Sequence, residues 1–138
     1  MAGSEKKDLP KIGKVSAKWI WASDPQTRKI KLRTSIELKN KPTFTSVLAT
    51  CDNAFSLRVN GKHLSSSREW TRPVYHEVSD FFKSGKNSIE VNAEMFGGSS
   101  GFIAQFSFGK GKDAITLVTD QTWEVQMDKK WIPAKLIH

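Results

Sequence analysis

The sequence predicts an all-β fold, either a sandwich or a barrel, from three observations. The clearest hydrophobic pattern has a period of two residues, which is typical of half-buried strands. Short apolar segments recur along the 138 residues and are separated by clusters of Gly, Asn, Ser and Asp. No segment has the pattern of a long amphipathic helix. Many short strands with regular turn signals are typical of sandwiches and barrels.

Each expected strand follows from its own stretch of sequence. "KIKLRTSIEL" alternates apolar with polar or charged residues, and "TSVLAT" is a short apolar run. "AFSLRVNGKHL" places its apolar residues on one face before Asn60-Gly61, a dipeptide that accepts the positive φ angles of a type I′ hairpin turn. Further strands are expected at 74–78, 87–94, 102–108, 114–118 and 123–127.

The remaining segments complete the expected organisation. "SDFFKSG" predicts a single helical turn, with Ser79 as its cap and Gly85 as its terminator. Residues 1–16 are predicted to be a polar lead-in that includes a tag remnant, and residues 17–138 a single β-sandwich domain. The residues after Trp131 are expected to be dispensable.

The composition excludes several classes of protein. No apolar run approaches the ~20 residues of a membrane span. Cys51 is the only cysteine, which rules out an internal disulfide and a cysteine-based zinc site. The net charge of +8, from 22 Lys and Arg against 14 Asp and Glu, is compatible with a nucleic acid or an acidic polysaccharide as partner. The lysines are scattered, however, so a charged surface is favoured over a nucleic-acid groove.

Strand parity brings several polar residues to one end of the predicted sandwich. If successive strands are antiparallel, Asp52-Asn53, the loop around Trp70, the "MFGGSSG" loop (95–101) and Asp120 all reach the same rim. Scattered residues would thereby form one candidate site.

These rim residues have chemistry suited to a sugar. Trp70 would offer an aromatic plate, with Arg68 and Arg72 as flanking donors, unless Trp70 is instead a buried lid. Asp52 and Asn53 offer oxygen ligands of the kind that Ca²⁺ takes. The alternative for this pair is an Asx turn that closes a strand.

Catalysis has little support in the sequence. None of His63, His76 and His138 has a neighbouring Ser, Cys or paired carboxylate in a recognisable arrangement. Glu69 and Glu94 would both reach the rim, as glycoside hydrolysis requires, but a small sandwich with a shallow rim seldom encloses a sugar well enough. We therefore expect a protein that is not an enzyme.

Several segments together resemble a known family. "AKWIWASD", "LATCDNAFSLRVNGK", "REWTRPVYHEVSDFFKSGKNSIEV", "GGSSGFIAQF" and "TDQTWEV" occur in this order and resemble the galactose-binding-like jelly-roll modules of bacterial α-L-rhamnosidases and related multidomain proteins. The resemblance covers roughly residues 17–134. It implies a non-catalytic antiparallel β-sandwich whose rim holds a sugar and often calcium.

The resemblance also implies roles for particular residues. Asp52 and Asn53 correspond to the pair that binds sugar and calcium, and Trp70 to an aromatic from the next loop. The rhamnose-binding members use an Asn before the Gly-containing loop, where this chain has Met95, or Glu94 if the gap shifts by one residue. The Pro of that loop is replaced by Ser99-Ser100.

The sequence thus predicts a carbohydrate-binding accessory module. Its expected ligand-binding residues are Asp52, Asn53, Trp70, Arg72 and Glu94, with Asp52 and Asn53 as ligands of Ca²⁺. The alternatives are a structural or protein-interaction domain without a glycan ligand, and a basic binder of acidic polysaccharide. By resemblance, the module is expected to belong to a larger extracellular, periplasmic or cell-surface protein.

Overall fold

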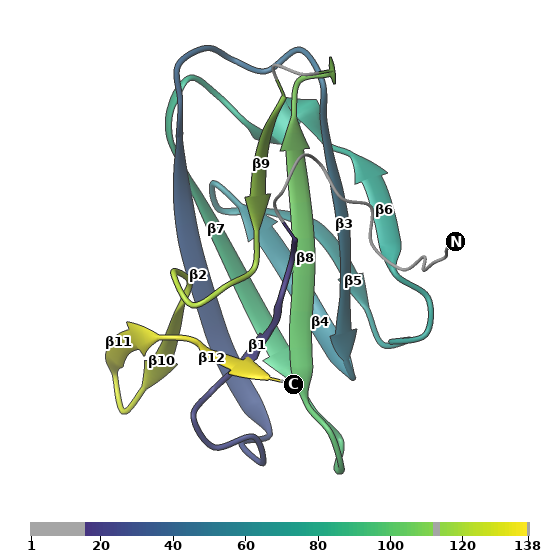
Figure 1. Cartoon of the computed structure of the whole chain (residues 1–138), viewed down its shortest axis with the longest axis vertical. Coiled ribbons are helices and arrows are strands. Elements are labelled where there is room, and N and C mark those ends of the chain that lie inside the picture. The colour runs from purple at the N-terminus through teal and green to yellow at the C-terminus, as the bar shows by residue number, and fades with distance from the viewer. Residues whose placement is uncertain (1–15, 112–113, 138) are drawn as a thin grey trace.

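The computed structural model describes residues 16–111 and 114–137, which are mostly β-strand (Figure 1). Residues 1–15 of the expected lead-in lie outside the described part of the chain, as does His138. The strands are β1 (Trp19–Trp21), β2 (Lys29–Leu38), β3 (Thr45–Asp52), β4 (Ala54–Val59), β5 (Lys62–Ser67), β6 (Val74–Glu77), β7 (Gly85–Glu94), β8 (Gly101–Phe108), β9 (Ile115–Val118), β10 (Glu124–Met127), β11 (Lys130–Pro133) and β12 (Lys135–Ile137).

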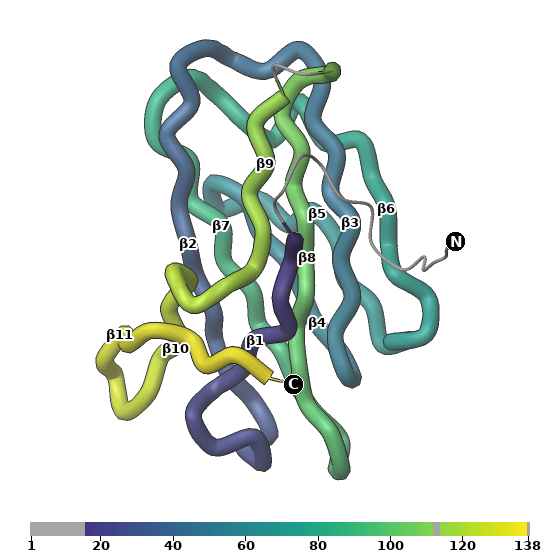
Figure 2. The backbone as a smooth tube through the Cα atoms, in the orientation of Figure 1, coloured from purple at the N-terminus to yellow at the C-terminus, as the bar shows by residue number. Residues whose placement is uncertain are grey.

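The strands form two antiparallel sheets that pack face to face, so the predicted β-sandwich is confirmed. The first sheet has the order β12-β1-β8-β3-β6, with β9 also paired to β8. The second has the order β11-β10-β2-β7-β4-β5. In Figure 1 the first sheet lies toward the viewer, and the tube in Figure 2 shows the loops that connect the two layers at both ends.

The predicted alternation fixes which side of each strand enters the core. Ile30, Leu32 and Leu38 of β2 are buried, whereas the charged residues between them face outward. The hairpin between β4 and β5 turns at Asn60 (φ 51°) and Gly61 (φ 81°), as a type I′ turn requires. These features were predicted from the sequence and are confirmed.

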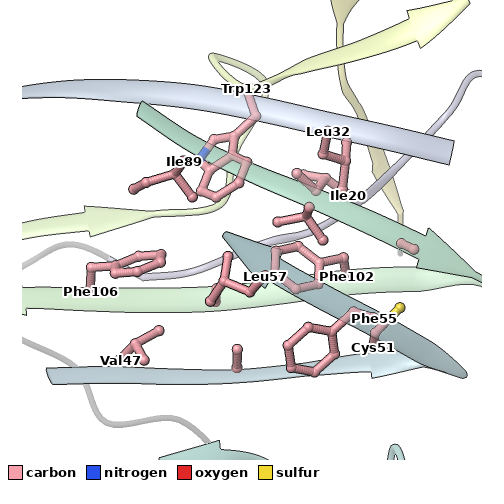
Figure 3. Close-up of a cluster of buried hydrophobic side chains, with 14 of the residues drawn as sticks. Ile20, Leu32, Val47, Cys51, Phe55, Leu57, Ile89, Phe102, Phe106 and Trp123 are labelled. Atoms are coloured by element: carbon pink, nitrogen blue, oxygen red, sulfur yellow. The ribbon is translucent and has the colours of Figure 1, made fainter. Parts of the chain in front are cut away.

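The core fills the space between the sheets with aromatic and branched side chains (Figure 3). Phe55 of β4 meets Phe102 of β8 edge-on, with ring centroids 5.5 Å apart. Trp123 is fully buried, and its indole N–H donates to the Val118 carbonyl at 2.9 Å. That hydrogen bond satisfies the polar atom of the side chain and lets the large ring occupy the core.

Two strands share one edge of β8. β9 pairs with the end of β8, from Phe108 to Gln105, whereas β1 pairs near its start, at Phe102. The main chain crosses between them where the Lys18 N–H donates to the Thr119 carbonyl at 2.8 Å. Because β1 takes the edge beyond Gln105, β9 cannot extend to the end of the sheet.

The predicted helical turn is shorter than expected. A 3-10 turn covers only Ser79–Phe81, and Val78 rather than Ser79 is its cap residue. The Ser79 hydroxyl instead accepts a hydrogen bond from the Thr45 N–H at 2.8 Å, which ties the turn to the start of β3. Gly85 begins β7 rather than ending a helix, so both assignments within this segment are wrong.

The C-terminal residues form two further strands of the sandwich. β11 pairs with β10 through Trp131 and Ile132, and β12 pairs with β1 through Leu136 and Ile137. The residues after Trp131, which were expected to be dispensable, are therefore part of both sheets in the structure. The described part of the chain has no helix long and apolar enough to cross a membrane.

Candidate functional site

Four connections meet at one end of the sandwich, which we call the rim: residues 22–28, Asp52-Asn53, residues 68–73 and residues 95–100. The rim is at the lower end of the view in Figure 1. The register places Asp52 opposite Gly101, and Ala54 opposite Glu94. The parity argument is therefore correct for Asp52-Asn53, the loop around Trp70 and the loop that begins at residue 95.

Asp52 and Asn53 bind the facing loop through their side chains. Asp52 Oδ2 accepts from the Ser99 hydroxyl at 2.5 Å, and Asn53 Oδ1 accepts from the Phe96 N–H at 2.6 Å. The Asn53 N–H donates to the Glu94 carbonyl at 2.8 Å. These bonds reach across to residues 94–99, unlike those of an Asx turn, which stay within a few residues. The pair thus orders residues 95–100, which we call the Gly/Ser loop.

Trp70 faces solvent beside the rim. Trp70 is 50% exposed, so the alternative of a buried lid is wrong. Its carbonyl accepts from the Thr50 hydroxyl at 2.9 Å, and Thr50 precedes Asp52 by two residues on the same face of β3. Arg72 follows in a turn closed by its N–H donating to the Glu69 carbonyl at 3.1 Å, and its side chain is exposed.

Arg68 and Phe96 form a contact that sequence reasoning missed. The Arg68 guanidinium carbon lies 4.8 Å from the centroid of the Phe96 ring, a cation–π geometry. Phe96 is 42% exposed, and its N–H is the one held by Asn53. The loops that carry Arg68 and Phe96 were both predicted to reach the rim, but the contact between the two side chains joins loops that are far apart in the chain.

The connection between β1 and β2 also belongs to the rim and was not predicted there. Gln26 Nε2 donates to the Gly98 carbonyl at 3.1 Å, and the Arg28 carbonyl accepts from the Met95 N–H at 2.8 Å. Asp24 caps a local turn by accepting from the Gln26 N–H at 2.9 Å. The dipeptide Asp24-Pro25 was the available signal of a turn at this position.

The side chains of Glu94 and Met95 have surroundings different from those of the Asp52 carboxylate. The Glu94 side chain is half-buried and lines a groove on the outer face of the second sheet. Asp52, by contrast, belongs to the first sheet and bonds Ser99. Met95 is 1% exposed and packs in the core. Its position therefore supplies no polar side chain to the rim.

Asp120 does not reach the rim, so this part of the parity argument is wrong. β9 ends at Val118, opposite Gln105 in the middle of β8, because β1 occupies the remaining edge. Asp120 instead closes its own turn: Oδ1 accepts from the Thr122 N–H at 2.8 Å.

The donor set at Asp52 and Asn53 suits a hard cation but contains one carboxylate. Within residues 16–111 and 114–137 there is no group of three or more His, Cys, Asp or Glu side chains that could hold a metal ion. A carboxylate or amide oxygen has two lone pairs, so the bonds from Ser99 and Phe96 leave capacity for a further ligand. A calcium ion here would need main-chain carbonyls, water or sugar hydroxyls as its other ligands.

One Ser–His contact exists that the sequence did not indicate. The Ser65 hydroxyl lies 3.0 Å from His76 Nε2 and joins β5 of one sheet to β6 of the other. Ser65 is buried, so its oxygen is shielded from any substrate. The contact therefore acts as a link between the edges of the two sheets rather than as an activated nucleophile.

Comparison with known proteins identifies the architecture. No protein-family model and no curated protein matches the sequence. Among solved structures, an α-L-rhamnosidase from Streptomyces avermitilis complexed with L-rhamnose superposes with a TM-score of 0.79, at 20% identity over 87% of this chain and 14% of that chain. A lectin from Pleurotus ostreatus gives 0.76, at 24% identity over 88% of this chain and 41% of that chain. The same lectin in complex with GalNAc gives 0.71, again at 24% identity, over 88% and 42% of the two chains.

The fold is shared with rhamnosidase and lectin sandwiches. The resemblance predicted from the sequence is thereby confirmed at the level of fold. The chain spans less than half the length of each of these structures, 14% of the rhamnosidase and 41% of the lectin.

Proposed function

We propose that this chain is a non-catalytic carbohydrate-binding accessory module that holds a sugar at the rim. The main observation behind the proposal is the Asp52-Asn53 pair at the end of the sandwich. Hydrogen bonds from the Ser99 hydroxyl and the Phe96 N–H hold the side-chain oxygens of this pair in place. Fixed carboxylate and amide groups suit the recognition of sugar hydroxyls, because the geometry is set before the ligand arrives.

The exposed aromatic surface of Trp70 supplies the second part of the proposal. An indole ring offers a flat apolar face to the C–H face of a pyranose, and Trp70 is half exposed beside the strand that ends at Asp52. Arg72 follows two residues later as a flexible donor to hydroxyls. A calcium ion at Asp52 and Asn53 would bridge the protein to vicinal hydroxyls.

The structural comparisons support the same function. Two of the matching structures are complexes with a sugar, L-rhamnose for the rhamnosidase and GalNAc for the lectin. A module that covers a small part of a rhamnosidase chain is suited to tethering a catalytic domain to its glycan, which raises the local substrate concentration. The proposed parent is a multidomain protein outside the cell, in the periplasm or on the cell surface, where polymeric glycans occur.

The test is a screen of neutral glycans, L-rhamnose and GalNAc included, with and without calcium. We expect binding to fall by about tenfold or more in Asp52→Ala and in Trp70→Ala, since each removes a hydrogen-bonded or stacked contact. Tyr75→Ala is the matched control for Trp70, because Tyr75 is an aromatic that is 59% exposed on β6. Its affinity should equal that of the wild type.

Two outcomes would contradict this proposal. Absence of binding to every neutral glycan would favour a structural or protein-interaction domain instead. For calcium, EDTA should lower the melting temperature of the wild type and leave that of Asp52→Ala unchanged, because an ion that binds only the folded state stabilises it. If EDTA changes the melting temperature of both proteins by the same amount, Asp52 is not a calcium ligand.

A further inference from the structure

The outer face of the second sheet carries a groove that is lined mostly by polar and charged residues and adjoins the rim at Arg68. Its main part has a volume of ≈ 670 Å³ and lies over β2, β7, β4 and β5. A depression of ≈ 190 Å³ continues it toward Trp131 and shares Lys31, Asn92 and Gln126 with its lining. A third, of ≈ 390 Å³, adjoins at Glu90. This face points away from the viewer in Figure 1.

Strand register aligns a row of hydrogen-bonding side chains across this groove. Ser66 pairs with Ser56, Ser56 with Asn92, and Asn92 with Lys31. Ser56 and Asn92 face outward, because the residues that alternate with them on β4 and β7 are in the core, and Ser66 and Lys31 are exposed. Neighbouring strands are ≈ 4.8 Å apart, close to the length of one sugar unit in an extended polysaccharide. The row can therefore meet successive units of one chain.

The charge of the groove favours an anion. Its main part is lined by Lys29, Lys31 and Arg68, with Glu94 as the only carboxylate among its lining residues. Within the described ranges, no ion pair joins any of these cations to another described residue. Glu94 lies opposite Lys29 in the register, so three cations against one carboxylate leave the groove with a local excess of positive charge.

The next row of side chains is different, which limits the anionic site to one part of the face. Arg58 pairs with Glu90, Glu90 with Arg33, and Arg33 with Glu124, so opposite charges alternate across four strands. Arg33 Nε donates to Glu124 Oε1 at 2.8 Å. The Arg33 guanidinium also lies 4.0 Å from the centroid of the Trp131 ring. Charges that compensate each other in this way leave little attraction for an external anion.

We propose that the groove binds an acidic oligosaccharide, a chain of sugars that carry carboxylates, independently of the rim. Lys29 and Lys31 pair with the carboxylates, and the hydroxyls of Ser56 and Ser66 together with the Asn92 amide bond the sugar hydroxyls. A single-stranded nucleic acid fits less well, because it needs exposed aromatic faces for its bases. The aromatic at the end of this row, Trp131, is half-buried and stacks with Arg33.

The test compares oligogalacturonate with an uncharged oligomer of galactose, each titrated into the full chain. We expect the acidic oligomer to bind and the uncharged one to bind at least tenfold more weakly at this site. Lys31→Gln should weaken the acidic oligomer about tenfold, as expected for the loss of one charge-assisted hydrogen bond. Lys39→Gln is the matched control: it removes the same charge at an exposed position that lines none of the three depressions.

A second variant and the rim variant make the test specific. Asn92→Ala keeps the charge and should still weaken the acidic oligomer, by about threefold to tenfold. Asp52→Ala should leave this affinity unchanged, so failure of the groove and failure of the rim are distinguishable. Arg68 is not used, because it contacts Phe96 at the rim as well as the groove. Equal melting temperatures verify that the exposed-site variants are folded.

Three results would overturn the proposal. The first is no binding of oligogalacturonate. The second is an equal loss of affinity in Lys31→Gln and Lys39→Gln, which would show that net charge alone attracts the anion. The third is tighter binding of a single-stranded oligonucleotide that Lys31→Gln weakens, which would assign the groove to nucleic acid.

Discussion

Cys51 illustrates how burial controls the chemistry of a single residue. The thiol is 1% exposed in the core, beside Asp52 in the sequence. Burial is the main reason that the pKa of Cys51 is raised from 9.0 to about 12, and the nearby Asp52 charge acts in the same direction. The thiolate, which is the reactive form, is therefore suppressed in the folded protein.

The buried Cys51 thiol leads to two predictions, one about its reactivity and one about the pH dependence of stability. We expect the thiol to react with a disulfide reagent only after unfolding. Between pH 9 and 12 the unfolded thiol ionises while the folded one keeps its proton, so the free energy of unfolding falls as the pH rises through this range. Below pH 9 both states are protonated, and the group has no effect on stability.

The control for this prediction is Cys51→Ala. Urea unfolding at pH 8 and pH 10.5 should show a smaller loss of stability in the variant than in the wild type, since the variant lacks the titrating thiol. The same loss in both proteins, or rapid labelling of the native thiol, would contradict the assignment of a buried, protonated Cys51.

At the scale of the element, the packing of β1 on β8 depends on the absence of a side chain at Gly101. A Cβ added there would lie 2.8 Å from Trp19 Cε3, closer than real Cβ contacts. Gly101→Ala should therefore destabilise the protein by about 1–3 kcal/mol, the usual cost of overpacking. The measurement is the free energy of unfolding in urea.

A double-mutant cycle tests the cause of this loss. In a Trp19→Leu background the ring is gone, so Gly101→Ala should cost less than it does in the wild type. If the two costs are equal, the clash with Trp19 is not the reason that Gly101 is needed.

Strand β9 shows which property of an element the sequence leaves open. Its residues were predicted from the apolar run "AITLV", but its reach was not, because β1 competes for the same edge of β8. The strand itself follows from local pattern, whereas the competition involves segments about 100 residues apart in the chain. Strand parity placed Asp120 at the rim, and this placement was wrong because parity does not take the competition for the edge of β8 into account.

At the scale of the whole molecule, the two ends of the described chain hold each other. β12 pairs with β1, and the Ala134 N–H donates to the Trp123 carbonyl at 2.8 Å. Deleting residues 134–138 should lower the free energy of unfolding by about 2–4 kcal/mol, through lost apolar burial and lost backbone hydrogen bonds. Thermal unfolding measures this loss directly.

Lys135→Gln is the control for this deletion, because Lys135 is exposed on β12 and its substitution keeps the strand. It should melt at the same temperature as the wild type. If the protein without residues 134–138 also melts at the wild-type temperature, β12 contributes nothing to stability.

The sequence by itself determined the strand periods, the Asn60-Gly61 turn, the all-β class and the meeting of Asp52-Asn53 with the Gly/Ser loop. The first three depend on alternation and turn chemistry, which act over a few residues, and the fourth follows from the antiparallel parity of successive strands. Only the tertiary structure decided that Gln26 joins the rim, that Arg68 covers Phe96 and that Glu94 faces the outer groove. The physical reason is that register, shared edges and packed loops couple segments far apart in the chain, and local pattern does not encode which of them become neighbours.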